Sequence, residues 1–299
     1  MKKLMILAVI LSLTACGGSS SSNPRPVDNG GLQSVAEPAP EQKPSIAASY
    51  GTPSADQIRP GALISADGSG CTGNFLYSPN AQTVYIGVAA HCFSSDTNSG
   101  VDPCESNNLP IGFNQITIEN ASQPGELVYT SWRAMQEMGE TAGSNVCTYN
   151  DFALVKIHAD DIAKIHPAAI AFGGPTAMFT GLATVGEEVY AYGQSPFHFG
   201  RRSREAKQGK INAVLGGGWA YDIVTDTASV SGDSGGPVFS AAGKALAVTS
   251  VVSLNVSPTL VSNGVANLDR ALRYAIDGGF INANTKLISW PDFYPAGDL

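Results

Sequence analysis

Short apolar runs separated by turns fill the chain from about residue 58 onward, and they constrain its fold more than any other feature. Each run is of strand length and rich in β-branched or aromatic side chains, the composition typical of β-strands. The runs read NFLYS, TVYIGVAA, QITIE, ELVYTSW, FALVKI, EEVYAYG, YDIVT, PVFS and ALAVTSVVS. Many short strands with few helical stretches predict an all-β fold, built as a sandwich or as barrels.

Composition agrees with a turn-rich β-protein and argues against one class of partner. The 299 residues include 33 glycines and 18 prolines. The 25 acidic residues outnumber the 17 basic ones, which gives a net charge of −8. Because nucleic-acid binding needs a concentrated positive surface, we expect no nucleic-acid partner. One helix is predicted, at NLDRALRYAIDGG (267–279), where apolar residues recur at helical spacing before a glycine pair.

The first 57 residues divide into a targeting signal, 1–16, and a tether, 17–57. The basic start MKK and the apolar run LMILAVILSL are typical of a signal peptide, and the run is too short to span a bilayer. The next residues, LTAC, resemble the lipobox of bacterial lipoproteins. That resemblance implies cleavage before Cys16, lipidation of Cys16 and a membrane anchor in the bacterial cell envelope, at the outer membrane because Gly17 follows. An ordinary signal peptide cut near Ala15 is the alternative. Residues 17–57 are rich in Ser, Pro, Gly and Ala and predict a flexible segment.

Five cysteines agree with an exported protein. An odd number in a secreted chain requires a separate role for one of them, and lipidation would account for Cys16. The other four are Cys71, Cys92, Cys104 and Cys147, enough for two disulfides in an oxidising compartment.

The stretch GDSGGP places Ser234 in a tight turn between two predicted strands. A serine held there is either a simple turn residue or a nucleophile with backbone N–H groups aimed at its substrate. The stretch also fits G-x-S-x-G, but in α/β-hydrolases the histidine follows the serine, and all four histidines precede Ser234. The order histidine, acid, serine remains possible. His91 ends a strand in VAAHCF, and Asp151 opens a buried strand in NDFALVKI, where a carboxylate is costly unless it is paired.

At these residues the chain resembles the chymotrypsin/trypsin-like serine proteases. AAHC, NDFALVKI and GDSGGP are similar to the three signature blocks of that family and stand in its order. The resemblance covers about residues 58–277 and implies two six-stranded antiparallel β-barrels with the active site between them. The barrels would span about 58–170 and 171–265, followed by a helix at 267–277 and a tail at 278–299.

The resemblance also implies roles for individual residues. Ser234 would attack the scissile carbonyl, His91 would act as base and then acid, and Asp151 would fix the tautomer of His91. The N–H groups of Gly232 and Ser234 would form the oxyanion hole. Cys71–Cys92 corresponds to the family's bridge beside the histidine, which leaves Cys104–Cys147 as the other pair. The substrate would be a protein or peptide, and we expect neither a cofactor nor a metal.

Specificity and activation depart from the family pattern. Ala228 stands where the trypsin branch carries a specificity aspartate, so cleavage after Lys or Arg is not expected. Ser250 would contact the substrate backbone, and Val252 would narrow the pocket, so that with Ala228 it would take small aliphatic residues. The chain has no Ile-Val-Gly-Gly block to supply a new amino terminus for Asp233. Either Asp233 finds an internal partner, or the oxyanion turn is not properly set.

Other interpretations of the sequence remain open. The scaffold could be a catalytically inactive, protease-like binding protein of the cell envelope, or an esterase that uses the same three residues. The basic stretch GRRSREAKQGK (200–210) is expected to be an exposed loop, and His158 and His166 are expected at the surface.

Overall fold

A closed barrel of six antiparallel strands forms the C-terminal half of the protein. Its strands are hydrogen-bonded in the order β10-β13-β12-β11-β8-β9. Their bounds are β8 Glu188–Gln194, β9 Arg204–Leu215, β10 Ala220–Thr225, β11 Pro237–Ser240, β12 Ala245–Ser253 and β13 Ser262–Asn267. The expected all-β class and the C-terminal barrel are therefore confirmed.

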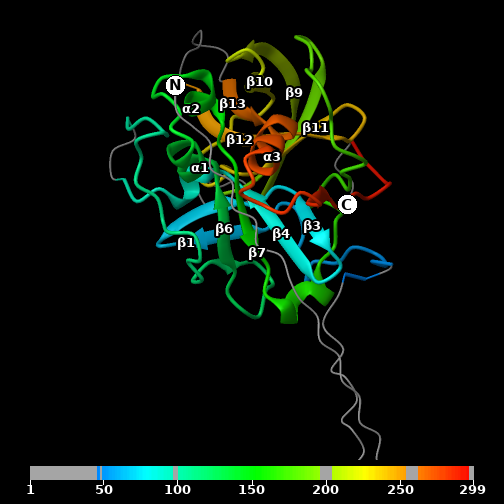
Figure 1. Cartoon of the computed structure of the whole chain (residues 1–299). Helices are drawn as coiled ribbons and strands as arrows, with labels where there is room; N and C mark the ends of the chain where they lie inside the picture. The colour runs from blue at the N-terminus through cyan, green and yellow to red at the C-terminus, as the bar shows by residue number, and fades with distance from the viewer. Residues whose placement is uncertain (1–45, 48, 97–99, 196–203, 254–261, 296–299) are drawn as a thin grey trace, which may run out of the picture. The chain divides into compact units, whose positions relative to one another are not determined.

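A computed structural model describes residues 46–47, 49–96, 100–195, 204–253 and 262–295. These residues lie in one compact unit, Gln42–Leu299 (Figure 1). The predicted signal peptide, Cys16 and the predicted tether up to residue 45 lie outside the described residues, whereas the end of the tether, apart from residue 48, is described. Within the described ranges, no helix is long and apolar enough to cross a membrane.

The N-terminal half differs from the expected closed six-stranded barrel, because its strands form two separate sheets. One sheet has the order β14-β3-β4-β7-β6 and the other the order β2-β1-β5. The bounds are β1 Leu63–Ala66, β2 Ser69–Thr72, β3 Leu76–Asn80, β4 Thr83–Val88, β5 Thr117–Ile118, β6 Glu126–Thr130, β7 Ala153–Lys156 and β14 Lys286–Leu287.

The chain passes from one sheet to the other between β2 and β3. The backbone N–H of Gly73 donates to the carbonyl of Ala62, next to β1 (2.8 Å), whereas the N–H of Asn74 donates to the carbonyl of Gly87 in β4 (2.7 Å). Just before this point, the N–H of Thr72 donates to the carbonyl of Ser234 in the other half of the protein (2.7 Å).

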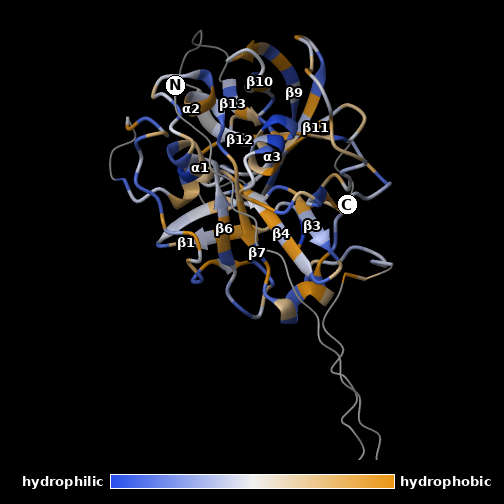
Figure 2. Cartoon of the chain, viewed as in Figure 1, coloured by the Kyte–Doolittle hydropathy of each residue, from blue (hydrophilic) through white to orange (hydrophobic). Residues whose placement is uncertain are grey.

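Apolar side chains fill the interiors of both halves. In Figure 2 the strands β4 and β7 carry long apolar stretches, and their residues Ile86, Val88, Leu154 and Val155 have no exposed surface. A second cluster fills the closed barrel with side chains such as Val238 and Val265. Burial of this alternating apolar face is what holds short strands in a sheet.

In the described part of the chain, three α-helices and two 3₁₀ turns accompany the strands: α1 Ser131–Glu137, α2 Asn145–Tyr149, α3 Leu268–Asp277, η1 Ala90–Phe93 and η2 Ala159–Lys164. The predicted C-terminal helix is confirmed as α3. The Asn267 side chain caps it by accepting a hydrogen bond from the backbone N–H of Arg270 (3.2 Å), and Leu268, Leu272 and Ala275 are buried. The predicted strand at ELVYTSW ends early, because α1 begins at Ser131.

The basic stretch at 200–210 is not a loop over its described part. From Arg204 it is the start of β9, which pairs with β8 on one side and β10 on the other. Ala206 and Gln208 are exposed whereas Lys207 between them is buried, which is the two-residue period of a strand with one face in the core. The polar composition of the stretch concealed that period.

The C-terminal segment binds to both halves of the protein. Strand β14 pairs with β3 of the N-terminal half. Farther on, the carbonyl of Asp292 accepts a hydrogen bond from Gly174 (2.7 Å), and the ring of Phe293 packs against Phe239 of β11. The segment thus links the two halves.

Candidate active site

The pairing of β4 with β7 brings His91 next to Asp151. Val88, at the end of β4, lies opposite Ala153, at the start of β7, in the antiparallel ladder. His91 follows β4 in the turn η1 and Asp151 lies two residues before β7, so both lie at the same edge of the sheet. The His91 ring Nδ1 is 2.7 Å from Asp151 Oδ2, and the backbone N–H of His91 donates to Asp151 Oδ1 (3.0 Å).

Burial and charge act in opposite directions on this pair. Burial lowers the pKa of His91, but the negative charge and hydrogen bond of Asp151 outweigh it and raise the pKa above the ordinary value. For Asp151, burial raises the pKa, whereas the charge and hydrogen bonds of His91 and the Ser250 hydroxyl leave it lowered. The carboxylate therefore stays ionised and favours a proton on Nδ1 of the imidazole.

Ser250 joins the same carboxylate from the closed barrel. Its hydroxyl on β12 donates to Asp151 Oδ2 at 2.5 Å. The sequence associated Ser250 with substrate, and the structure places its side chain on Asp151. The side chain of Val252 lies outside the described part of the structure, although its backbone pairs with Asn263 of β13.

The turn that carries Ser234 depends on its glycines. Gly232 has φ +102° and Gly235 has φ +86°, values that residues with a Cβ rarely adopt. A Cβ on Gly235 would lie 2.4 Å from the carbonyl oxygen of Thr72, and one on Gly236 would lie 2.3 Å from that of Tyr192. The glycines therefore allow this turn to lie directly against the backbone of both halves.

His91, Gly232 and Ser234 line one cavity of about 670 Å³ beside the Cys71–Cys92 bridge. Among the described residues, neither the backbone N–H of Gly232 nor that of Ser234 donates a hydrogen bond. Two free N–H groups beside a serine and a histidine suit the stabilisation of a developing negative charge on oxygen.

Two residues that the sequence analysis missed hold the Ser234 turn from the N-terminal half. The hydroxyl of Thr72 donates to the carbonyl of Gly232 (2.8 Å) and accepts from the backbone N–H of Gln194 (2.9 Å). The side-chain amide of Asn74 donates to the carbonyl of Gly235 (3.1 Å). Both side chains have no exposed surface. No sequence signal marks them, because their partners are more than 100 residues away along the chain.

Asp233 has an internal partner. Its Oδ2 lies 3.0 Å from Nζ of Lys207, and both side chains are 1% exposed. Lys207 also donates to the carbonyl of Ala228 (3.0 Å). The first of the two alternatives for Asp233 is therefore the one observed, with a lysine from a stretch that the sequence analysis assigned to a surface loop.

Both predicted disulfides are present, Cys71–Cys92 and Cys104–Cys147. The first joins β2 to the turn that carries His91, and the second joins the segment after β4 to α2, just before Asp151. Of the two histidines expected at the surface, His158 is exposed but His166 is fully buried. The ring of His166 packs against Trp290, 4.7 Å between centroids, and its Nδ1 accepts a hydrogen bond from Ala168.

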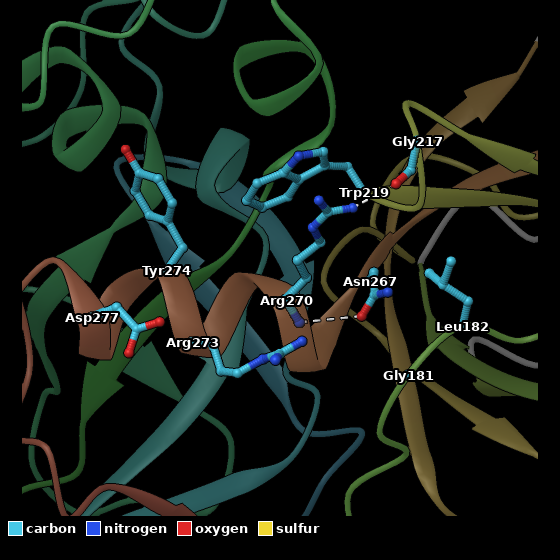
Figure 3. Close-up of a pocket in the computed structure, with 9 residues that line it drawn as sticks. All are labelled: Gly181, Leu182, Gly217, Trp219, Asn267, Arg270, Arg273, Tyr274 and Asp277. Carbon is cyan, nitrogen blue, oxygen red and sulfur yellow. Dashed lines mark hydrogen bonds between the residues drawn. The ribbon is translucent and has the colours of Figure 1, made fainter.

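A second hollow of about 530 Å³ lies along α3 and contains none of the predicted site residues (Figure 3). The Arg270 guanidinium lies 4.6 Å from the centre of the Trp219 ring and donates to the carbonyl of Gly217 (2.6 Å). Arg273 is paired with Asp269 at 2.7 Å. Both of its cationic side chains are thus engaged within the protein.

Comparison with known protein families shows which family the chain belongs to. Residues 71–248 match the model of the trypsin-like peptidase domain. This stretch is more than half of the 299 residues, and the chain belongs to that family. No curated protein matches the sequence.

The solved structures that match this chain include several proteases. One is a glutamic acid-specific serine protease that uses a histidine triad in substrate binding, at 19% identity over 77% of this chain and 100% of that chain, with a TM-score of 0.45. Another is the Cellulomonas bogoriensis chymotrypsin, at 18% identity over 78% of this chain and 99% of that chain, with a TM-score of 0.44. A Glu endopeptidase matches at 18% identity over 79% of this chain and 97% of that chain, with a TM-score of 0.46.

Proposed function

We propose that this protein is a serine endopeptidase in which His91, Asp151 and Ser234 form the catalytic triad. One observation carries the proposal: His91, already paired with Asp151, shares a cavity with Ser234 and with the free N–H groups of Gly232 and Ser234. Membership of the trypsin-like peptidase family supports a peptide substrate.

The proposed mechanism follows from the hydrogen bonds of His91. Since Nδ1 donates to Asp151, Nε2 is the nitrogen that takes the proton of the Ser234 hydroxyl as its oxygen attacks the scissile carbonyl carbon. The oxyanion that forms would accept hydrogen bonds from the N–H groups of Gly232 and Ser234. His91 then gives this proton to the leaving amine, which leaves an acyl-enzyme on Ser234. In the second half of the reaction, His91 takes a proton from the attacking water and gives it to the Ser234 oxygen as the acyl group leaves.

For specificity, we propose cleavage after small aliphatic residues. Ala228 carries no charge that would attract Lys or Arg, and the sequence aligns Val252 with the wall of the pocket. We further propose that the enzyme is anchored to a bacterial envelope membrane through lipid on Cys16. Several acyl chains would give a stable anchor where one would not.

A fluorophosphonate probe tests the proposed chemistry, because it reacts covalently with an activated serine. The purified full-length chain and its Ser234→Ala variant are treated side by side, and peptides with Ala, Val, Leu, Lys or Arg before the scissile bond are then compared with small esters. Labelling of the wild type alone, with peptide cleavage, supports the endopeptidase. Turnover of esters without peptide cleavage identifies an esterase. Absence of labelling under all conditions identifies an inactive, protease-like binding protein.

A further inference from the structure

A lysine inside the closed barrel requires an explanation. Lys207 lies on β9, and its side chain is 1% exposed although Ala206 and Gln208 on either side face the solvent. An ammonium group in a protein interior is strongly unfavourable unless it is paired and hydrogen-bonded. A buried lysine at this position is therefore maintained by specific partners.

The partners of Lys207 are one backbone carbonyl and two carboxylates. Its Nζ donates to the carbonyl oxygen of Ala228 (3.0 Å) and lies 3.0 Å from Asp233 Oδ2 and 3.5 Å from Glu205 Oε2. Glu205 Oε2 makes no hydrogen bond among the described residues, so Glu205 acts on the ammonium group through its charge. Two of these three partners lie in or next to the segment that carries Ser234.

Asp233 connects Lys207 to the backbone of the Ser234 turn through hydrogen bonds. Its Oδ2 also accepts from the backbone N–H of Val230 (3.0 Å), its own N–H donates to the carbonyl of Val230 (3.0 Å), and its carbonyl accepts from Gly236 (3.0 Å). The side chain and both neighbouring peptide groups are thus fixed. In this arrangement the N–H groups of Gly232 and Ser234 remain free and line the cavity with His91.

The barrel provides space for the carboxylate of Asp233. A Cβ on Gly193 of β8 would lie 2.2 Å from Asp233 Oδ1, so only glycine fits at this position. Gly193 pairs with Glu205, two residues before Lys207. The strands β8 and β9 therefore form a pocket for the buried ion pair.

We propose that Lys207 is a positioning residue that sets the oxyanion turn while residues 17–57 are still attached, so that this protease is active without proteolytic removal of that segment. The inference rests on the proposed function. In activated zymogens of the chymotrypsin/trypsin-like proteases, a new amino terminus pairs with the aspartate before the serine. A terminus that paired with Asp233 in the same way would have to displace Lys207 from its buried contacts. Without Lys207, the Asp233 carboxylate would lose the buried ammonium group 3.0 Å away, and the turn that holds Gly232 and Ser234 would rearrange.

The test measures the rate of fluorophosphonate labelling in the full-length chain, together with peptide mapping of the labelled product. We expect the wild type to label while residues before Ile58 are still attached. Lys207→Met should label at least about 10²-fold more slowly, the cost of losing one oxyanion-hole donor. Lys210→Met is the matched control on the same strand, because Lys210 is exposed, and its rate should equal that of the wild type.

Two further variants separate positioning from a general loss of folding. In the double variant Lys207→Met/Asp233→Asn the carboxylate that faced Lys207 at 3.0 Å is replaced by a neutral amide, and labelling should be faster than in Lys207→Met alone. In Lys207→Ala, added ethylammonium fits the space left by the side chain and should restore labelling in a saturable way. A protein that had simply failed to fold would respond to neither change.

The outcomes distinguish this inference from the proposed function. Labelling only after the chain has been cut between Gly17 and Ile58 overturns the role of Lys207 and leaves a serine protease. Equal rates for wild type and Lys207→Met also overturn it. No Ser234-dependent labelling of the cut or uncut chain overturns the proposed function and this inference together.

Discussion

Thr72 connects the two halves of the protein at the Ser234 turn. The variant Thr72→Val tests how much this connection contributes to the free energy of unfolding and to labelling at Ser234. Valine has nearly the shape of threonine but cannot hydrogen-bond. The change leaves the carbonyl of Gly232 without its donor at 2.8 Å and the N–H of Gln194 without its acceptor at 2.9 Å. Thr72 has no exposed surface, so water cannot simply replace the lost hydroxyl.

The expected cost follows from these two orphaned groups. Each buried polar group left without a partner costs about 1–3 kcal/mol, which gives about 2–6 kcal/mol in the free energy of unfolding. That is a large fraction of the ~5–15 kcal/mol typical of a folded domain. Because the carbonyl of Gly232 belongs to the turn, labelling at Ser234 should also slow, by up to about 10²-fold.

Urea unfolding with intact disulfides measures the stability change, and fluorophosphonate labelling measures the effect on the turn. Thr130→Val is the matched control, because Thr130 is equally buried and its hydroxyl has no hydrogen-bond partner in the described structure. It should be neutral or slightly stabilising. Thr72→Ser keeps the hydroxyl and should retain labelling. A free energy of unfolding for Thr72→Val within about 0.5 kcal/mol of the wild type would refute the reasoning.

Three further predictions concern charged groups. Asp151→Asn removes the group that orients His91 and should lower kcat by about 10⁴-fold, the effect seen for the corresponding change in a serine protease triad, with unfolding measured to show that the protein still folds. Since Asp151 raises the pKa of His91 and the neutral imidazole is the base, kcat/KM should fall on acidification with a midpoint above about 6.5; a midpoint below that value would contradict the pairing. Asp161 has no exposed side chain, and although burial raises its pKa, the Lys164 ammonium and the donors of Ser122 and Gln123 lower it to about 2. The ionised Asp161 carboxylate therefore contributes roughly 2 kcal/mol to the free energy of unfolding above about pH 4, and this contribution is lost as the pH falls through about 2. The difference in unfolding free energy between wild type and Asp161→Asn should shrink as the pH is lowered over that range; a difference that grows would contradict the prediction.

The sequence was sufficient to predict the strands in which apolar residues alternate with polar ones or follow one another without a break. TVYIGVAA, FALVKI and PVFS are strands in the structure, because apolar residues of strand length have few other stable environments. The C-terminal helix was also predictable from its cap and periodicity. The three blocks that carry His91, Asp151 and Ser234 are long enough to indicate the family without any structure.

Polar segments were less predictable from sequence. The stretch from Arg204 to Lys210 is rich in charge, so its pattern indicated a loop, yet pairing with β8 and β10 makes it a strand. His166 looked like a surface residue, but Trp290 of the C-terminal segment covers it. In both cases the deciding contact comes from a distant part of the chain, and local pattern carries no information about it.

The sequence by itself therefore determined the β-rich class and the four cysteines that form the two disulfides, and it predicted a grouping of His91, Asp151 and Ser234 in which the contact of His91 with Asp151 is observed. Only the tertiary structure decided what holds them: Thr72 on the Ser234 turn, Ser250 on Asp151, and Lys207 on Asp233. The physical reason is that the chemistry of a reactive side chain is visible in its residue type, whereas the cost of burying a hydroxyl or a charge depends on partners that only folding supplies.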